Sequence, residues 1–150
     1  MNTGVRRIPI ILILTFSALT GVSCESREET VNCFPRQQVG VQVFLNLPRF
    51  QPLQHPGGWV YLDDPGSGTR GLIVIRTTMG FNVYDRNAPH LCPGPETTLE
   101  VKDDIKIICP QDGAEWMLLT GQPLKIAKIA PKRYNYTFDP ASSTLTIVDY

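Results

Sequence analysis

The chain has 150 residues and a formal net charge of zero, with 42% hydrophobic and 19% charged residues. This length suits one domain with a sizeable core and is too short for two. The ordinary apolar content excludes a disordered protein, and the balanced charge gives no support to a nucleic-acid partner.

The first 24 residues have the pattern of an export signal. Arg6 and Arg7 form a basic start, residues 8–19 form an apolar run too short for a comfortable membrane span, and small residues precede Cys24. Removal of this segment would leave twelve basic and fourteen acidic residues, a net charge of −2. The arginine pair also permits the twin-arginine route, although the apolar run after it favours export of an unfolded chain.

A cysteine directly after small residues at this point resembles the lipobox of bacterial lipoproteins. The resemblance implies cleavage before Cys24 and attachment of lipid to its thiol. Gly21 stands where that motif usually has leucine, so ordinary signal-peptidase cleavage nearby is the alternative. Residues 25–37 are polar and are expected to form a tether. We therefore expect an exported protein, anchored in a bacterial membrane through lipid, on the periplasmic or outer-surface side.

From residue 38 onward, short β-branched and aromatic runs alternate with turn residues. Glycine and proline interrupt this region too often for a long helix. Residues 38–150 are therefore predicted to form one all-β domain, a sandwich or a small barrel. No nucleophile and base stand in a recognisable pattern, so no enzymatic activity is predicted. The expected strands are 39–45, 58–62, 71–76, 81–85, 99–102, 105–108, 133–138 and 145–148.

Two proline-rich loops interrupt these strands, DRNAPHLCPGPE at 85–96 and CPQDGAEW at 109–116. Here the chain resembles the Rieske domain, whose pattern is C-x-H in one loop and C-P-x-H-G, then an aromatic residue, in the other. In that family two cysteines hold one iron and two histidines the other iron of a [2Fe–2S] cluster. The runs FNVYDRNAPH and LLTGQPL extend the resemblance, over residues 38–148, to Rieske-like bacterial lipoproteins. It implies stacked antiparallel sheets with two long loops meeting at one tip.

The ligand pattern of that family is incomplete in this chain. In the first loop Ala88 stands at the cysteine position and His90 at the histidine position. In the second loop Cys109 is kept, and Asp112 stands at the histidine position. Each iron would therefore lack one of its two protein ligands. This implies a domain that has lost its cluster, holds no cofactor, and acts as a binding or structural module for an unidentified protein partner.

A second set of donors defines the alternative function. His90, Cys92, Cys109 and Asp112 supply nitrogen, sulfur and oxygen atoms that zinc or iron accepts. With such ligands the protein would be an electron carrier that holds a [2Fe–2S] cluster or a single metal ion in an unusual way.

The cysteines have a simpler use, because disulfides form after export into an oxidising compartment. If the two loops meet at one tip, as the resemblance implies, Cys92 and Cys109 are expected to pair. Cys33 would then be the odd thiol. It could instead pair with Cys92 or Cys109, or stay free in the tether, since sequence does not define the connectivity.

Overall fold

The computed structural model describes residues 30–149, so the export segment and Cys24 lie outside the described residues. Within them the chain forms three antiparallel sheets, and the all-β prediction is confirmed. The first sheet contains β1 (Gly40–Phe44), β10 (Thr144–Val148) and β9 (Asn135–Asp139). The second contains β2 (Trp59–Leu62), β3 (Leu72–Arg76) and β4 (Phe81–Asp85). The third contains β5 (Glu100–Lys102), β6 (Lys106–Ile108), β7 (Glu115–Met117) and β8 (Pro123–Lys125).

The second sheet is the middle layer of the molecule, and its central strand β3 is buried on both faces. Successive side chains of a strand point to opposite faces. Leu72 and Val74 therefore join the core shared with the first sheet, while Ile73 and Ile75 join the core shared with the third. This explains why the β3 segment reads as an unbroken apolar run rather than as an alternating one.

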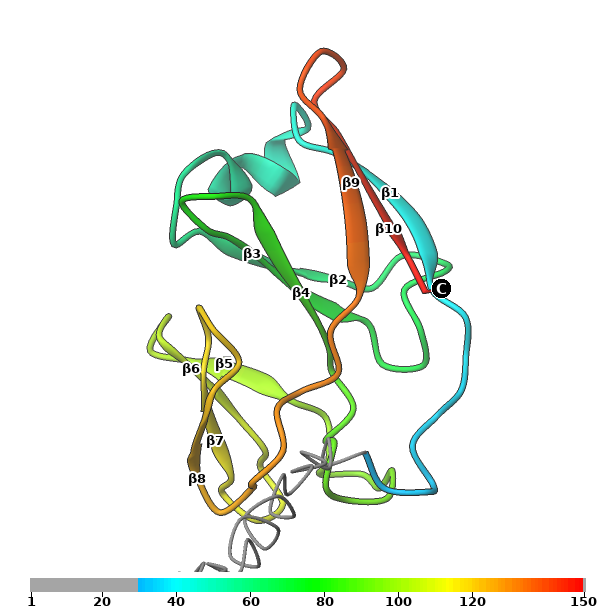
Figure 1. Cartoon of the computed structure of the whole chain (residues 1–150), viewed down its shortest axis with the longest axis vertical. Helices are drawn as coiled ribbons and strands as arrows, with labels where there is room; N and C mark the ends of the chain where they lie inside the picture. The colour runs from blue at the N-terminus through cyan, green and yellow to red at the C-terminus, as the bar shows by residue number, and fades with distance from the viewer. Residues whose placement is uncertain (1–29, 150) are drawn as a thin grey trace, which may run out of the picture.

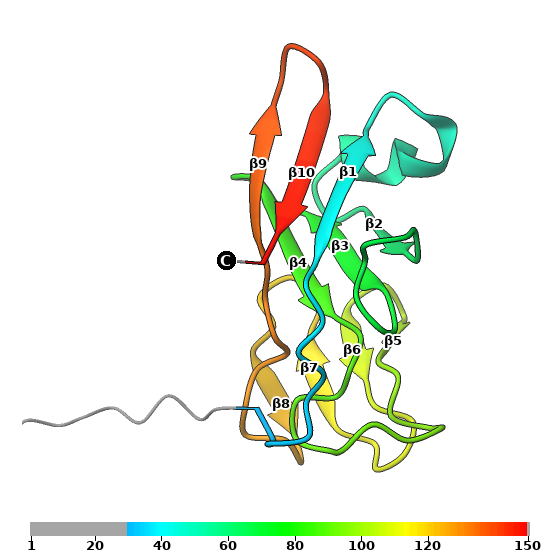
Figure 2. The ribbon, with the colours of Figure 1, turned by 90° about the vertical axis from the view of Figure 1, so that its right-hand side faces the viewer.

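The layers give the molecule two distinct ends (Figure 1). The β9–β10 hairpin and the 3₁₀ helix η1 (Pro48–Gln54) lie at one end, and the third sheet lies at the other (Figure 2). The helix η1 begins with a proline and buries Phe50 and Leu53 against the core shared by the first two sheets. No helix within residues 30–149 is both long and apolar enough to cross a membrane.

Two strands were not predicted, and both belong to the third sheet. The second loop was expected to extend to residue 116, but it ends at Ala114 because Glu115–Met117 pairs with β6. Trp116 enters the core from this strand, where it is fully buried. The three-residue β8 pairs with β7 through an irregular register. Strands this short show too few alternations to be recognised in a sequence.

Candidate functional site

The two proline-rich loops meet at the end of the molecule that holds the third sheet (Figures 1 and 2). We call residues 87–95 and 109–116 the loop tip. The first loop connects β4 to β5, and the second connects β6 to β7. A backbone hydrogen bond of 3.0 Å, from Gln111 N–H to the Glu96 carbonyl, joins the second loop to the end of the first. The expected meeting of the loops is therefore present.

His90 of the first loop is bonded directly to Asp112 of the second. His90 Nε2 lies 2.7 Å from Asp112 Oδ2, and the two side chains are 16% and 25% exposed. The His90 ring also packs edge-to-face on Trp116, with ring centroids 5.5 Å apart. His90 and Asp112 are the positions at which the Rieske resemblance would place the two ligands of one iron. Here they contact each other.

Asp112 is stabilised as a carboxylate by several donors. Burial raises its pKa, but hydrogen bonds from His90, the Ala114 N–H and the Cys109 thiol outweigh burial and hold the pKa below its ordinary value. The Ala114 N–H lies 3.0 Å from Oδ1, so both carboxylate oxygens have partners. His90 Nδ1 is buried and has no hydrogen-bond partner among the described residues.

Ala88 and Cys109, the positions assigned to the other iron, lie in the apolar core. They are 2% and 0% exposed, and both belong to the core cluster that contains Ile107 and Trp116. Burial raises the pKa of the Cys109 thiol, and the neighbouring Asp112 carboxylate raises it further. The thiol is therefore neutral at ordinary pH and packs as a small apolar group.

These residues do not fit a [2Fe–2S] cluster. Ala88 offers no donor atom, Cys109 is fully buried in the apolar core, and both oxygens of Asp112 already accept hydrogen bonds. In the described part of the chain, no three or more His, Cys, Asp and Glu side chains form a group that could hold a metal ion. The alternative ligand set is also incomplete, because Cys92 is bonded to Cys33.

The Cys33–Cys92 disulfide corrects the predicted Cys92–Cys109 pair. The Cα atoms of Cys33 and Cys92 are 5.4 Å apart, and Cys109 is the free thiol among the described cysteines. The reason lies in where the side chains are. Cys109 is fully buried in the core between the second and third sheets, whereas Cys92 and Cys33 are both exposed.

The disulfide makes the N-terminal segment a third component of the loop tip. Residues 31–34 fall in the predicted tether, yet they are attached to the domain. The Val31 N–H donates to the Pro89 carbonyl at 3.0 Å, and Phe34 is only 7% exposed. Residues 31–34 of the tether expected at 25–37 are therefore part of the domain, because Phe34 is buried and the disulfide binds Cys33 to the first loop.

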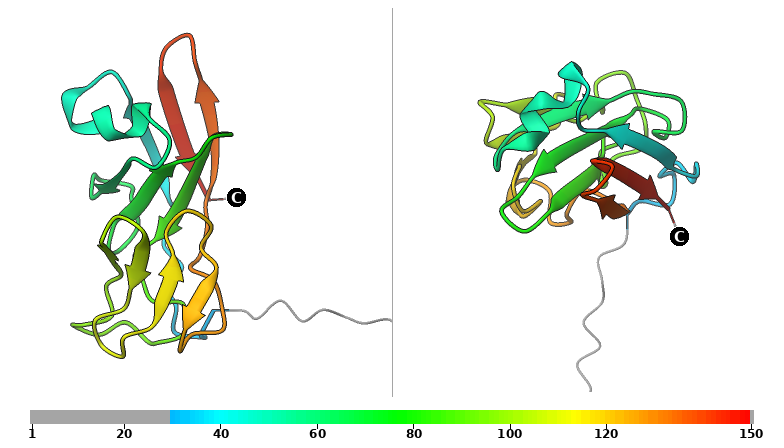
Figure 3. Two further views of the ribbon diagram at one scale, coloured as in Figure 1. Left: turned by 90° about the vertical axis from the view of Figure 1, so that its left-hand side faces the viewer. Right: turned by 90° about the horizontal axis from the view of Figure 1, so that it is seen from above.

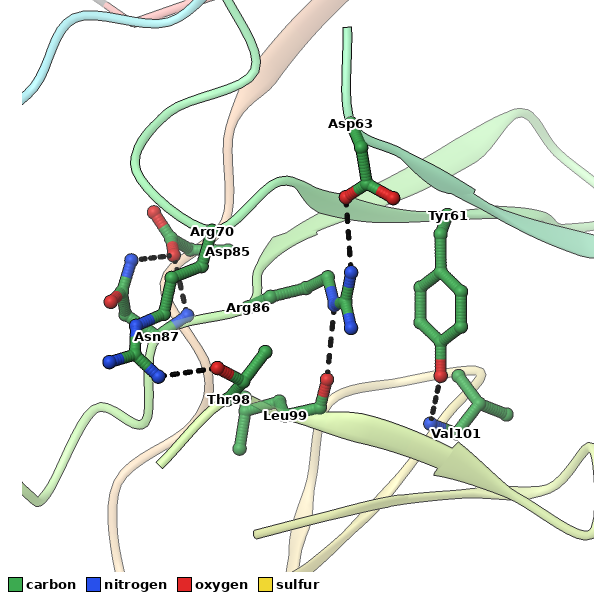
Figure 4. Close-up of polar contacts among 9 residues, drawn as sticks. All are labelled: Tyr61, Asp63, Arg70, Asp85, Arg86, Asn87, Thr98, Leu99 and Val101. Atoms are coloured by element: carbon green, nitrogen blue, oxygen red, sulfur yellow. Dashed lines mark hydrogen bonds and ion pairs between the residues drawn. The ribbon is translucent and has the colours of Figure 1, made fainter. Parts of the chain in front are cut away.

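Arg70, in the turn between β2 and β3, and Arg86, directly after β4, hold the far end of the first loop (Figure 4). Arg86 donates from Nη1 to Asp63 at 3.0 Å and from Nε to the Leu99 carbonyl at 3.2 Å. Arg70 donates to the hydroxyl of Thr98. The bonds to Leu99 and Thr98 reach the segment just before β5, and the Asp63 carboxylate holds Arg86 in place, so together they fix the end of the first loop relative to the second sheet.

A buried carboxylate holds the near end of the same loop. Asp85 is 3% exposed and accepts hydrogen bonds from the backbone N–H of Asn87 at 2.7 Å and its side-chain amide at 2.8 Å (Figure 4). The hydroxyl of Tyr134 donates to the other Asp85 oxygen at 2.5 Å. Burial, and then this bond to Asp85, raise the pKa of Tyr134. These hydrogen bonds fix Asn87, the first residue of the loop tip, to the buried carboxylate of Asp85.

Sequence reasoning did not identify Arg70, Asp85 or Arg86 as supports of the loop tip. A usable signal is the Asp-Arg pair that directly follows the buried strand segment FNVY, because charged residues at the end of a buried strand need partners. Arg70 carries no comparable signal, since it stands in a glycine-rich turn.

No family model matches the sequence, and no curated protein matches it. The structure is similar to the ferredoxin of carbazole 1,9a-dioxygenase from Nocardioides aromaticivorans IC177. The sequence identity is 17% and the TM-score is 0.45, and the match covers 75% of this chain and 99% of that chain. It is also similar to a Mycobacterium tuberculosis protein described as the small subunit of an NADH-dependent nitrite reductase. In this second comparison the sequence identity is 16% and the TM-score is 0.43, and the match covers 76% of this chain and 97% of that chain. Similarity of this degree defines neither a function nor a ligand for this chain.

Proposed function

We propose that this chain is an exported, lipid-anchored, Rieske-like domain that holds no [2Fe–2S] cluster and acts through its loop tip as a binding or structural module. One observation carries the proposal, the 2.7 Å bond between His90 Nε2 and Asp112 Oδ2. A metal ion lies about 2 Å from each nitrogen or oxygen ligand, which separates tetrahedral ligand atoms by about 3.4 Å. The His90 and Asp112 side chains are therefore paired with each other in this structure and are not set apart at the spacing that a shared ion requires.

In the proposed module, the bonds at the loop tip connect the two loops, which a bound cluster would otherwise do. The His90–Asp112 pair and the Gln111–Glu96 hydrogen bond connect the two loops directly. The disulfide attaches the first loop to the N-terminal segment. A loop surface fixed in this way loses little conformational entropy when it binds a partner. This supports a binding role for the loop tip without a cofactor.

The position of Cys33 relates the loop tip to the proposed anchor. Nine peptide steps separate Cys24 from Cys33, and an extended chain of that length spans at most about 30 Å. Because Cys33 is bonded to the first loop, lipid on Cys24 would keep the loop tip within about 30 Å of the membrane surface. The partner best suited to this position is a protein embedded in, or attached to, the same membrane.

The anchor is tested with Cys24→Ser in the full-length chain, expressed in a bacterial host. We expect the wild type to sediment with membranes and to incorporate labelled fatty acid, and the variant to do neither. Ser26→Ala is the control, because it changes the same segment without removing the proposed lipid site or the Cys33–Cys92 disulfide. Equal membrane recovery and labelling of wild type and Cys24→Ser would contradict the lipid anchor.

The binding role is tested by photo-cross-linking in intact membranes. A photoreactive residue at Gln111, exposed at the loop tip, is expected to give a discrete adduct. The same residue at Thr137, exposed on β9 at the other end, is the matched control and should give none. Adducts from Thr137 alone would assign the contact to another face, and adducts from neither position would contradict a stable partner at the loop tip.

A further inference from the structure

A pocket of about 250 Å³ lies at the end of the domain opposite the loop tip. Segments far apart in the sequence line it: the turn after β1, the end of η1, the end of β3, and the β9–β10 hairpin. The views of Figure 3 show η1 and this hairpin at the same end of the molecule. The lining residues are Leu45, Asn46, Leu53, Gln54, Arg76, Phe138 and Ser143.

Arg76 supplies a positive charge to this pocket that nothing in the described structure neutralises. None of the ion pairs among residues 30–149 involves Arg76. Its Nε is buried and has no hydrogen-bond partner within the same residues. A guanidinium group carries five N–H donors and no acceptor, so a buried N–H without a partner costs free energy. The buried Nε–H of Arg76 therefore lacks an acceptor among residues 30–149.

Two aromatic rings hold the guanidinium in place. The Arg76 Cζ atom lies 4.5 Å from the ring centroid of Phe81 and 5.7 Å from that of Phe138. The backbone of Arg76 is also fixed, because its N–H donates to the Gly58 carbonyl at 2.8 Å and its carbonyl accepts from the Gly57 N–H at 2.8 Å. A cation placed on ring faces keeps its charge and its in-plane N–H groups available to an anion.

The other lining residues divide into an apolar wall and polar groups without negative charge. Leu45, Leu53 and Phe138 form the wall. Gln54 Nε2 donates to the Leu45 carbonyl at 3.1 Å, which fixes the orientation of that side chain. Asn46 and Ser143 add a further amide and hydroxyl, and no Asp or Glu lines the pocket. The chemistry therefore matches a ligand with one anionic end and one apolar end.

We propose that this pocket binds a small organic carboxylate whose short alkyl chain contacts the leucines and Phe138. Arg76 binds the carboxylate through paired N–H donors, the geometry in which guanidinium and carboxylate groups fit best. The pocket volume equals on the order of eight water molecules, which suits a ligand of that size. A ligand this small binds with a Kd of about 1 mM. This site is independent of the loop tip and of the proposed membrane anchor.

The probe is hexanoate, titrated into the folded wild-type domain while amide and arginine Nε–Hε signals are followed by NMR. We expect shifts at Arg76 and at the pocket residues, with saturation in the millimolar range. Hexan-1-ol has the same number of carbon atoms in an unbranched chain but no charge, and it is expected to bind at least about tenfold more weakly, since a charge-assisted pair is lost. Equal binding of the alcohol and the acid, or no shift at Arg76, would overturn the proposal.

Two variants make the test specific. Arg76→Gln removes the charge and should weaken hexanoate binding at least about tenfold. Arg36 is exposed and lies outside this pocket, so Arg36→Gln should leave hexanoate binding unchanged.

Asn46→Asp places a carboxylate inside the pocket at nearly constant size. It should weaken hexanoate binding, because the added negative charge repels the carboxylate of the ligand and competes for Arg76. If Arg76→Gln fails to fold, Asn46→Asp carries the test alone. Unchanged hexanoate affinity in Asn46→Asp would contradict the site.

Discussion

His90 and Asp112 belong to different loops, 22 residues apart in sequence, and their side chains meet at 2.7 Å. The pair stands where the Rieske resemblance would place the ligands of one iron. The corresponding pair for the other iron, Ala88 and Cys109, is buried in the apolar core. A polar bond at one pair of positions and apolar packing at the other together connect the two loops.

The His90–Asp112 bond should contribute measurably to stability. In a double-mutant cycle of His90→Ala and Asp112→Ala, we expect a coupling of about 1 kcal/mol in the free energy of unfolding, because the pair is partly shielded and hydrogen-bonded. Urea unfolding of the four proteins at neutral pH measures it. The pair Lys106–Glu115, which is more exposed, serves as the comparison and should couple more weakly. Zero coupling energy would show that the His90–Asp112 pair does not stabilise the fold.

The same bond predicts how stability changes in acid. The pKa of Asp112 is lower in the folded protein than its ordinary value of 3.8. Such a group stabilises the fold fully above its unfolded pKa, and this stabilisation is lost as the pH falls through the folded pKa. The wild type should therefore lose more stability than Asp112→Asn from about pH 5 downward. Urea unfolding at a series of pH values tests this, and parallel curves for the two proteins would contradict it.

The disulfide should be a major contributor to stability. Cys33 and Cys92 are 59 residues apart, and closing a loop of that length contributes about 4 kcal/mol in the chain-entropy treatment. The double variant Cys33→Ser, Cys92→Ser should lose about that much free energy of unfolding, measured by urea denaturation.

The connectivity is tested by non-reducing peptide mapping of the wild type, which should recover Cys33 joined to Cys92. Cys109 should react with thiol reagents only after unfolding, because it is buried. A Cys92–Cys109 peptide would contradict the observed connectivity.

The buried anchor of the first loop should be costly to disrupt. Tyr134→Phe removes the hydroxyl that donates to Asp85 and leaves a buried carboxylate oxygen without that partner. We expect a loss of about 2 kcal/mol in the free energy of unfolding. Tyr136→Phe is the matched control, since Tyr136 is less buried and accepts a hydrogen bond from the Phe81 N–H. A smaller loss for Tyr134→Phe than for Tyr136→Phe would contradict the role assigned to Asp85.

Most of the fold could be predicted because the strands carry strong local patterns. β3 reads as an unbroken apolar run, and the strand β9 alternates the half-buried residues Tyr136 and Phe138 with exposed residues. β7 and β8 could not be predicted, because three residues cannot show a period. The helix η1 was also missed, because it is only seven residues long and contains two prolines.

The candidate site was predicted in its residues but not in all its contacts. The positions of Ala88, His90, Cys109 and Asp112 within two loops could be read from the sequence. The partner of Cys92 could not, because the direction of the Cys109 side chain depends on how Trp116 and Ile107 pack around it. Arg76 and its pocket were missed, because their residues come together only through the packing of η1, β3 and β9.

The most direct test of the central claim measures iron and acid-labile sulfide in the chain, produced together with cluster-assembly proteins. The variant Ala88→Cys, Asp112→His restores the four ligands of the family pattern and is the positive control for assembly. We predict no iron, no sulfide and no visible absorption band in the wild type. Iron and sulfide near two atoms each per wild-type chain, with a band lost in Cys109→Ser, would contradict the account and establish an electron carrier with unusual ligands.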